Sequence, residues 1–438
     1  MLAAQGTLAR PEAPDSWLLA PDRFSGDERS RKVIDNRRLE NLSRERGRNF
    51  QPWEVLTMKR RQLFPAGFVT MIMLLGLAWD FGAAFLFGQE LSQGSRLPKR
   101  LVGDYGYWSR TQTPPYSSAQ IPFNELTHIN HAGVSFNTTG MLVVPTGFLE
   151  PELIQSAHAA GVKVLLLLGG SFPALVVNPA LINTLVGNLQ AFINQNGYDG
   201  VDVDWEYPGT IADRQTFFNL FTALRAAFPS PTYVLSADVP PWGGLGYDFS
   251  GVEPVLDYFN IMMYDCAGPW TDDAQLNSAI FPDSNNPEPY ECEPGGSVEE
   301  AADIFLNQLN LPASKLNMGT PFYGYAYTNV SALWGSCTNC GSTVVSENYG
   351  TFIKQRINQQ GWETFYDPIS LVPYMLKIDG SPGYITYDDY FSTYYRVWYS
   401  VWKRGLGGTF MWSLDADYDG HSQDLLDAMY RGTTQRNN

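Results

Sequence analysis

Short apolar runs alternate with amphipathic stretches from about residue 100 to the end of the chain. Runs rich in β-branched, aromatic and leucine residues predict strands, whereas apolar positions three and four apart predict helices. Eight strands are expected, at 101–105, 127–136, 163–168, 199–206, 232–239, 257–265, 315–323 and 408–415. Helices are expected between them, at 151–160, 178–196, 213–227, 298–309 and 392–404. This alternation predicts an α/β fold, a (β/α)₈ TIM barrel.

The interval between the seventh and eighth expected strands is too long for a single crossover. Residues 325–383 have a pattern of their own, at Thr343–Val345, Thr351–Gln359 and Leu371–Lys377. We therefore expect a small α+β domain inserted between strands 7 and 8 of the barrel.

The amino-terminal part of the chain differs from the rest. Residues 1–62 are rich in Arg, Asp, Glu, Ser and Pro without a sustained apolar period, which predicts a disordered basic segment. Residues 63–88 are almost entirely apolar and follow Lys59, Arg60 and Arg61. A basic stretch followed by an apolar run and small residues is typical of a secretory signal peptide.

Two alternatives for this segment stay open. A start at Met58 would give an ordinary cleaved signal peptide, and we favour cleavage; the other possibility is a single-pass membrane anchor at 63–88. In both cases the body is expected to be extracellular, either secreted or held at the membrane. There the four cysteines can form disulfides, and Asn137 and Asn329 can accept glycans.

Charge and composition limit the ligand. The net charge is −16, yet residues 1–62 hold 13 Lys and Arg against 9 Asp and Glu, so the remainder is strongly acidic. An acidic body repels phosphate backbones, which excludes nucleic acid as its ligand. Aromatic residues make up 14% of the chain, and rings of this kind can stack on sugars.

One expected strand concentrates the acidic residues. In Asp199-Gly-Val-Asp-Val-Asp-Trp-Glu, side chains alternate, so Asp202, Asp204 and Glu206 share one face and the apolar residues share the other. In a barrel the acids would point inward, with Glu206 nearest the carboxyl-terminal mouth where barrel enzymes work. Neighbouring buried carboxyls raise one another's pKa, and a Glu that stays protonated near neutral pH is a general acid.

Two other interpretations of these acids are less favoured. Three structural carboxylates with no basic residue nearby would each cost several kcal/mol of burial. A Ca²⁺ or Mg²⁺ site is disfavoured because ligands in a line on one strand do not wrap an ion. Asp204 also lies on the same side as Glu206, so it is badly placed as an in-line nucleophile. A substrate that supplies its own nucleophile, such as the acetamido group of N-acetylglucosamine, removes that difficulty.

The motif Asp199-x-x-Asp202-x-Asp204-x-Glu206 resembles the signature of glycoside hydrolase family 18, the chitinases, and the likeness extends over about residues 99–432. Further segments are similar to the family's sixth, seventh and eighth strands: Met262-Met-Tyr-Asp265, Pro321-Phe-Tyr-Gly324 and Phe410-Met-Trp-Ser-Leu-Asp415. The insertion at 325–383, which precedes Tyr384-Ile-Thr-Tyr387-Asp-Asp389, resembles the family's insertion domain. The likeness is greatest to the fungal class V type.

The resemblance implies roles for the matching residues. Glu206 would protonate the glycosidic oxygen, Asp204 would orient the acetamido group, and Asp202 would exchange a proton with Asp204. Tyr264 would bond the acetamido carbonyl, and Trp412 would stack under the sugar. We expect further substrate contacts from Asp265, Met262, Tyr207, Trp108 and Tyr325.

Two positions depart from the family pattern. The third strand usually ends Ser-x-Gly-Gly, but here it reads Leu167-Leu-Gly-Gly170, so a hydroxyl that would bond the carboxylates is missing. Tyr325 stands where the family often has Arg, so one sugar contact is lost or replaced by stacking. Neither change removes the acid.

The resulting hypothesis is a monomeric chitinase that cleaves β-1,4 bonds between N-acetylglucosamine units with retention, using no metal and no cofactor. The alternatives are an endo-β-N-acetylglucosaminidase acting on N-glycans and a chitin-binding lectin without catalysis. The inserted domain favours chitin, because it deepens a groove for a linear polymer. The presence of Glu206 argues against a lectin.

Overall fold

The computed structural model describes residues 97–286, 292–337 and 340–435. The predicted basic segment at 1–62 and the predicted signal peptide or anchor at 63–88 lie outside these residues. Within the described ranges, no helix is both long enough and apolar enough to span a bilayer.

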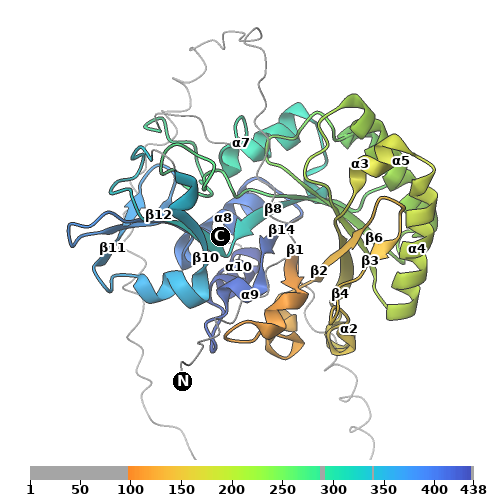
Figure 1. The fold of residues 1–438 in the computed structure, drawn as a ribbon, viewed down its shortest axis with the longest axis horizontal. Coiled ribbons are helices and arrows are strands. Elements are labelled where there is room, and N and C mark those ends of the chain that lie inside the picture. The colour runs from red at the N-terminus through yellow and green to blue at the C-terminus, as the bar shows by residue number, and fades with distance from the viewer. Residues whose placement is uncertain (1–96, 287–291, 338–339, 436–438) are drawn as a thin grey trace, which may run out of the picture. The chain divides into compact units, whose positions relative to one another are not determined.

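Eight parallel strands close into a barrel, as the alternating pattern predicts (Figure 1). The strands pair in the order β1-β14-β8-β7-β6-β5-β4-β2, and β2 returns to β1 through register pairs from Val102–His128 to Gly106–Ala132. Their bounds are β1 Arg100–Gly106, β2 His128–Phe136, β4 Lys163–Leu168, β5 Gly200–Asp204, β6 Val234–Val239, β7 Tyr258–Ile261, β8 Leu316–Pro321 and β14 Gly408–Trp412. A two-residue strand, β3 Leu142–Val143, pairs antiparallel with β2.

Helices connect the strands, and α4 and α5 lie outside β4 and β6 in Figure 1. The α-helices are α2 Pro151–Ala159, α3 Phe172–Val177, α4 Leu181–Asn196, α5 Ile211–Ala227, α6 Phe249–Val252, α7 Val298–Asp303, α8 Tyr390–Trp398, α9 Leu414–Asp417 and α10 Asp424–Thr434. Two of them continue as π-helical turns, α7 into Ile304–Gln308 and α8 into Tyr399–Lys403. The helix α5 begins at a capping box, in which Thr210 and Asp213 bond each other's backbone N–H.

A second sheet follows strand β8, which is the seventh strand of the barrel. It is antiparallel, with the order β10-β9-β13-β12-β11. Its strands are β9 Tyr323–Tyr327, β10 Val344–Asn348, β11 Trp362–Asp367, β12 Val372–Lys377 and β13 Tyr384–Thr386. The sheet thus extends beyond the range 325–383 at both ends. Sequence patterning missed β11, and the segment 351–359 overlaps a π-helical turn at Tyr349–Ile353 that is followed by a 3₁₀ turn at Lys354–Arg356.

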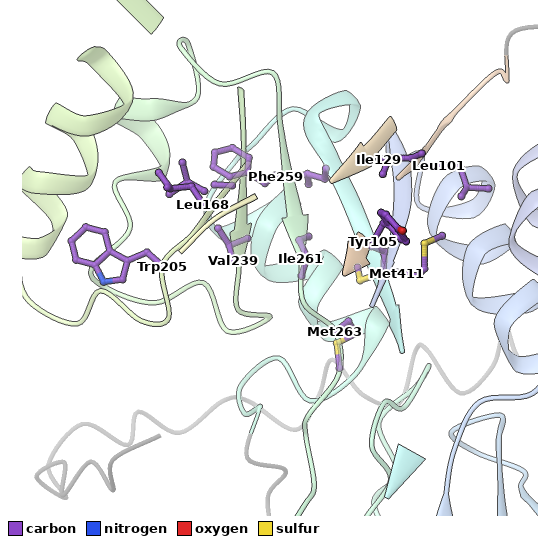
Figure 2. Packing of buried hydrophobic residues seen from close by; sticks show 14 of the residues in the cluster. Leu101, Tyr105, Ile129, Leu168, Trp205, Val239, Phe259, Ile261, Met263 and Met411 are labelled. Atoms are coloured by element: carbon purple, nitrogen blue, oxygen red, sulfur yellow. The ribbon is translucent and has the colours of Figure 1, made fainter. Parts of the chain in front are cut away.

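The hydrophobic core lies mainly between the strands and the surrounding helices. Figure 2 shows part of this cluster, including Leu168, Trp205, Val239 and Phe259 from neighbouring strands. Trp205 stacks on Phe172 of α3 with ring centroids 4.8 Å apart. The outward face of β5 is therefore apolar, as its alternation predicts, and the inward face is left for the acids.

The cysteines form two disulfides, Cys266–Cys292 and Cys337–Cys340. The first joins the segment after β7 to the segment before α7, and the second closes a short loop after β9. The sequence left the pairing open among three possibilities.

Candidate active site

The acids of β5 form a row that runs from the barrel interior to solvent. Asp202 is completely buried, Asp204 is half-buried and Glu206, just past the end of the strand, is exposed. The predicted strand 199–206 is therefore shorter in the structure, but the three side chains keep their common face. The carboxyl group of Glu206 can therefore contact a ligand, while those of Asp204 and Asp202 lie deeper in the barrel.

Asp202 is held by neutral donors from three other strands of the barrel. The hydroxyl of Ser236 on β6 donates to its Oδ1, the amide of Asn130 on β2 donates to its Oδ2 over 3.0 Å, and the amide of Asn260 on β7 reaches its Oδ1 over 3.4 Å. Burial raises the pKa of Asp202 to about 6, while the hydrogen bonds from Ser236 and Asp238 oppose that rise. Donors to a carboxylate stabilise its charged form, so Asp202 is suited to hold a negative charge.

The third strand of the barrel, β4, lacks the hydroxyl at Leu167, but Ser236 on β6 supplies one to Asp202. Leu167 lies in register with Asp202 on one side, and Ser236 lies in register with it on the other. Asp202 therefore receives a hydroxyl hydrogen bond despite the departure at Leu167.

Asp204 and Glu206 interact with each other at the end of β5. Burial raises the pKa of Asp204 well above its usual range, and the negative charges of Glu206 and Asp202 raise it further. Glu206 is exposed, yet protein surrounds it closely enough that desolvation raises its pKa, a change that a hydrogen bond from Tyr207 opposes. A carboxyl with a raised pKa beside solvent is able to donate a proton to a bound ligand.

Aromatic and acidic residues from β7 and the inserted sheet meet beside this row. Tyr323 and Tyr325 of β9 both donate to Oδ1 of Asp265, over 2.5 and 2.7 Å. Met262, Tyr264, Tyr323 and Tyr325 belong to one buried cluster. Tyr325, where the resemblance leads us to expect Arg, therefore fixes the position of the Asp265 carboxylate. It also contacts Trp270 edge-on, with centroids 5.6 Å apart.

Two tryptophans lie at the ends of neighbouring barrel strands. Trp412 ends β14 and packs against the cluster that contains Tyr264, and its ring centroid is 6.2 Å from that of Trp108 in the turn after β1. Tyr207, which follows Glu206, contacts Trp242 with centroids 5.3 Å apart. Eight of the ten predicted residues lie at or just past the carboxyl-terminal ends of barrel strands, and Met262 among them is almost completely buried. Asp202 lies inside β5, and Tyr325 lies on β9 of the inserted sheet.

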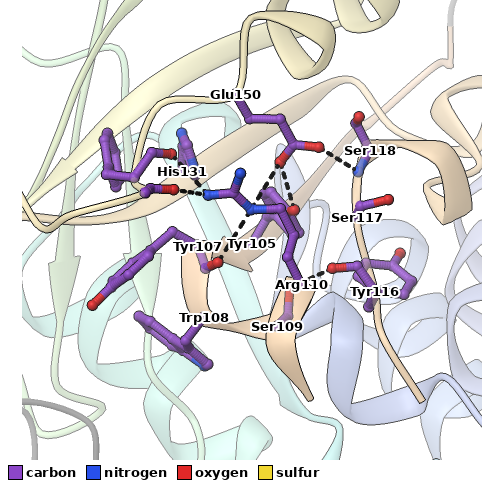
Figure 3. Close-up of polar contacts among 12 residues, drawn as sticks. Tyr105, Tyr107, Trp108, Ser109, Arg110, Tyr116, Ser117, Ser118, His131 and Glu150 are labelled. Carbon is purple, nitrogen blue, oxygen red and sulfur yellow. Dashed lines mark hydrogen bonds and ion pairs between the residues drawn. The ribbon is translucent and has the colours of Figure 1, made fainter. Parts of the chain in front are cut away.

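Hydrogen bonds and one ion pair centred on Glu150 stabilise the turn that contains Trp108 (Figure 3). Glu150 accepts hydrogen bonds from the Tyr105 hydroxyl over 2.7 Å and from the Ser118 backbone N–H over 2.9 Å, and it pairs with Arg110 at 3.5 Å. Arg110 also donates to the Phe148 carbonyl over 3.2 Å. These contacts connect the 3₁₀ turn Tyr107–Thr111 to the residue that precedes α2. The backbone that carries Trp108 is therefore held in place by the rest of the barrel.

Sequence reasoning missed five polar residues of the barrel interior: Asp104, Asn130, Ser236, Asp238 and Asn260. All five are buried polar side chains in strands that were predicted correctly. The available signal was the alternation within each strand, since Ser236 and Asp238 are two residues apart, as Asp202 and Asp204 are. Among the described residues, no group of three or more His, Cys, Asp or Glu side chains is arranged to hold a metal ion.

A closed parallel barrel with acids at the carboxyl end of one strand, tyrosines and tryptophans beside them and an inserted sheet after the seventh strand defines a barrel glycoside hydrolase. The model of the glycosyl hydrolases family 18 matches residues 100–417, and the chain belongs to that family.

Relatives of known name include chitinases from fungi and plants. Chitinase 1 of Aphanocladium album is 25% identical over 75% of this chain and 83% of its own length. The class V chitinase of Arabidopsis thaliana is 29% identical over 71% of this chain and 85% of its own length. The Group II chitinase catalytic domain 2 of Ostrinia furnacalis has the same fold, with a TM-score of 0.68 and 23% identity over 77% of this chain and 96% of that domain.

Proposed function

We propose that the protein is a chitinase that hydrolyses β-1,4 bonds between N-acetylglucosamine units with retention of configuration. The observation that supports this most directly is the graded row of acids, from buried Asp202 to exposed Glu206, at the end of β5. Fungal and plant relatives with the name chitinase support the substrate class.

In the proposed first step, Glu206 gives its proton to the glycosidic oxygen while the carbonyl oxygen of the substrate's own acetamido group attacks the anomeric carbon. The bond to the leaving sugar breaks, and a positively charged oxazolinium ion forms. Asp204 orients the acetamido N–H and stabilises that charge, and Asp202 exchanges a proton with Asp204. Water then attacks the anomeric carbon, the bond between that carbon and the acetamido oxygen breaks to restore the acetamido group, and Glu206 takes up the water's proton.

The surrounding residues have binding roles in this proposal. Trp412 and Trp108 offer adjacent rings for stacking on sugar faces. The hydroxyl of Tyr264 bonds the acetamido carbonyl. Asp265 accepts from two tyrosines through Oδ1, so its other oxygen is available to a sugar hydroxyl.

Incubation with chitin tetramers to hexamers, and separately with a glycoprotein that bears high-mannose N-glycans, tests this function. We expect chito-oligosaccharide cleavage to be the faster reaction by at least tenfold in kcat/KM, because the site is built for consecutive acetamido sugars. Faster release of N-glycans would instead identify the endo-β-N-acetylglucosaminidase, and the adjacent rings of Trp412 and Trp108 would then not serve consecutive sugars of chitin. Binding of the oligomers without turnover would identify the lectin.

A further inference from the structure

Two carboxyl groups in the barrel interior have no part in the proposed reaction. Asp104 on β1 is 1% exposed and Asp238 on β6 is 4% exposed. Asp238 lies in register with Asp204, and both new acids interact electrostatically with Asp202. The closed end of the site therefore contains four carboxyl groups: Asp104, Asp202, Asp204 and Asp238.

Hydrogen-bond donors are unequally distributed among these groups. Asp202 accepts from the side chains of Ser236, Asn130 and Asn260. Asp104 accepts at Oδ1 from Asn130 over 2.9 Å, and its Oδ2 is buried without a hydrogen-bond partner among the described residues. Asp238 accepts at Oδ1 from Asn260 over 3.0 Å. Because donors stabilise charge on the oxygen that accepts them, the negative charge is most stable on Asp202.

The carboxyl group of Asp238 lies beside that of Asp202. The side-chain amide of Asn260 reaches Oδ1 of Asp202 over 3.4 Å and Oδ1 of Asp238 over 3.0 Å, so the two carboxyl groups share one donor and lie close together. Two facing carboxylates cannot both be ionised at such a range, so one proton must lie between them. Since Oδ1 of Asp238 accepts from Asn260, its Oδ2 is the atom that bears this proton.

Within the described ranges, no cationic side chain forms an ion pair with the cluster. The Arg100 guanidinium instead donates to Asn317 over 3.0 Å, and Asn317 donates to Asn260 over 2.9 Å. The remaining titratable groups that face Asp238 are Tyr247 and Tyr264, whose pKa values burial raises well above the usual range. These tyrosines are neutral, so protons must neutralise the cluster.

We propose that Asp238 is a positioning residue that stays protonated and donates a hydrogen bond to Asp202, with Asp104 as a second neutral acid, so that the cluster keeps its single negative charge on Asp202. This rests on the proposed function, in which Asp202 must be ionised to take up the proton of Asp204. The proton moves between Asp204 and Asp202, while the proton of Asp238 stays in place. Asp238 therefore acts on the reaction only through Asp202.

Protonation of Asp238 in the folded state has a consequence for stability. Burial raises the pKa of Asp238 well above its usual range. Below about pH 4 the residue is protonated in both the folded and the unfolded chain and contributes no pH dependence. At higher pH the unfolded chain releases this proton and the folded chain keeps it. Stability is therefore lost as pH rises, and the unfolding constant gains about a factor of ten per pH unit from this residue alone.

Urea unfolding of the wild type and of Asp238→Asn between pH 5 and 7 tests the protonation state. We expect the unfolding constant of the wild type to rise about 100-fold more than that of the variant across this range, because Asn has no proton to release. Asp417→Asn is the matched control for the method, since burial raises the pKa of Asp417 on α9 to about 7. Equal slopes for the wild type and Asp238→Asn, with a reduced slope for Asp417→Asn, would overturn the proposal.

The pH profile of kcat/KM on a chitin tetramer tests the positioning role. The acid limb of the wild type is expected near pH 6, from protonation of Asp202. Asp238→Asn keeps a hydrogen-bond donor, so the pH of the acid limb should stay unchanged. Asp238→Leu removes the donor, so the acid limb should shift to a pH about one unit higher. Asp417→Asn should leave the profile unchanged. An unmoved limb in Asp238→Leu would contradict the role, and absence of turnover in the wild type would contradict the proposed function while leaving the unfolding result intact.

Discussion

Glu206→Gln is expected to lower kcat on chito-oligosaccharides by about 10²–10⁴-fold while leaving their binding nearly unchanged. Gln has almost the same shape as Glu, but it cannot protonate a leaving oxygen or accept a proton from water. The raised pKa of Glu206 keeps the acid form available at neutral pH, and its exposure at the end of β5 lets it reach a ligand. Steady-state rates on a chitin tetramer, together with calorimetric binding of the same oligomer, separate the loss of chemistry from a loss of affinity.

A glutamate elsewhere in the chain supplies the control for this variant. Glu300 on α7 also has a raised pKa, to about 7, because of burial, and its carboxylate accepts from the Ser297 hydroxyl over 2.8 Å. Gln can accept the same hydrogen bond, so Glu300→Gln should retain full activity. Equal kcat for Glu206→Gln and wild type would remove Glu206 from the mechanism.

Asp204→Asn is expected to lower kcat by about 10²–10³-fold. The substitution removes the carboxylate that orients the acetamido group and stabilises the positive oxazolinium ion. Asp204 is well placed for this because Oδ1 is buried without a hydrogen-bond partner among the described residues, so one oxygen is uncommitted before substrate arrives. Single-turnover rates at saturating substrate measure the loss directly, since they do not include product release.

The matched control for this prediction lies on the same stretch of chain. Asp199 immediately precedes β5, where its carboxylate accepts from the Val164 backbone N–H over 2.7 Å and pairs with His158 at 2.8 Å. Asp199→Asn should change stability but leave kcat of the folded enzyme intact. If Asp204→Asn raised KM with kcat unaltered, Asp204 would be a binding residue and not one that stabilises the transition state.

The barrel and the acid row were predictable because both follow from simple periodicities. Buried parallel strands appear as short apolar runs, and alternation alone puts Asp202, Asp204 and Glu206 on one face. The strand ends were less predictable. Tyr264 and Asp265 were expected within a strand, but β7 ends at Ile261, and backbone hydrogen bonding to neighbouring strands decides where pairing stops.

Contacts across the barrel could not be predicted from one strand at a time. Ser236 replaces the hydroxyl absent at Leu167 because β6 lies on the other side of β5, which depends on the closed strand order. Tyr325 bonds Asp265 because the inserted sheet begins at Tyr323. Asp104 and Asp238 had the alternation that marks inward side chains, but each is a single acid in an otherwise apolar run, and only closure of the barrel brings them to Asp202.

Hydrolysis of chito-oligosaccharides with fluorinated acetamido groups tests the central claim most directly. Fluorine leaves the substituent uncharged and close to its original size but makes its carbonyl oxygen a weaker nucleophile. If the substrate's acetamido group attacks the anomeric carbon while Glu206 protonates the leaving oxygen, kcat falls stepwise from the acetyl to the monofluoro-, difluoro- and trifluoroacetyl substrates. A kcat that stays the same across the four substrates would contradict this account and would require a nucleophile from the protein.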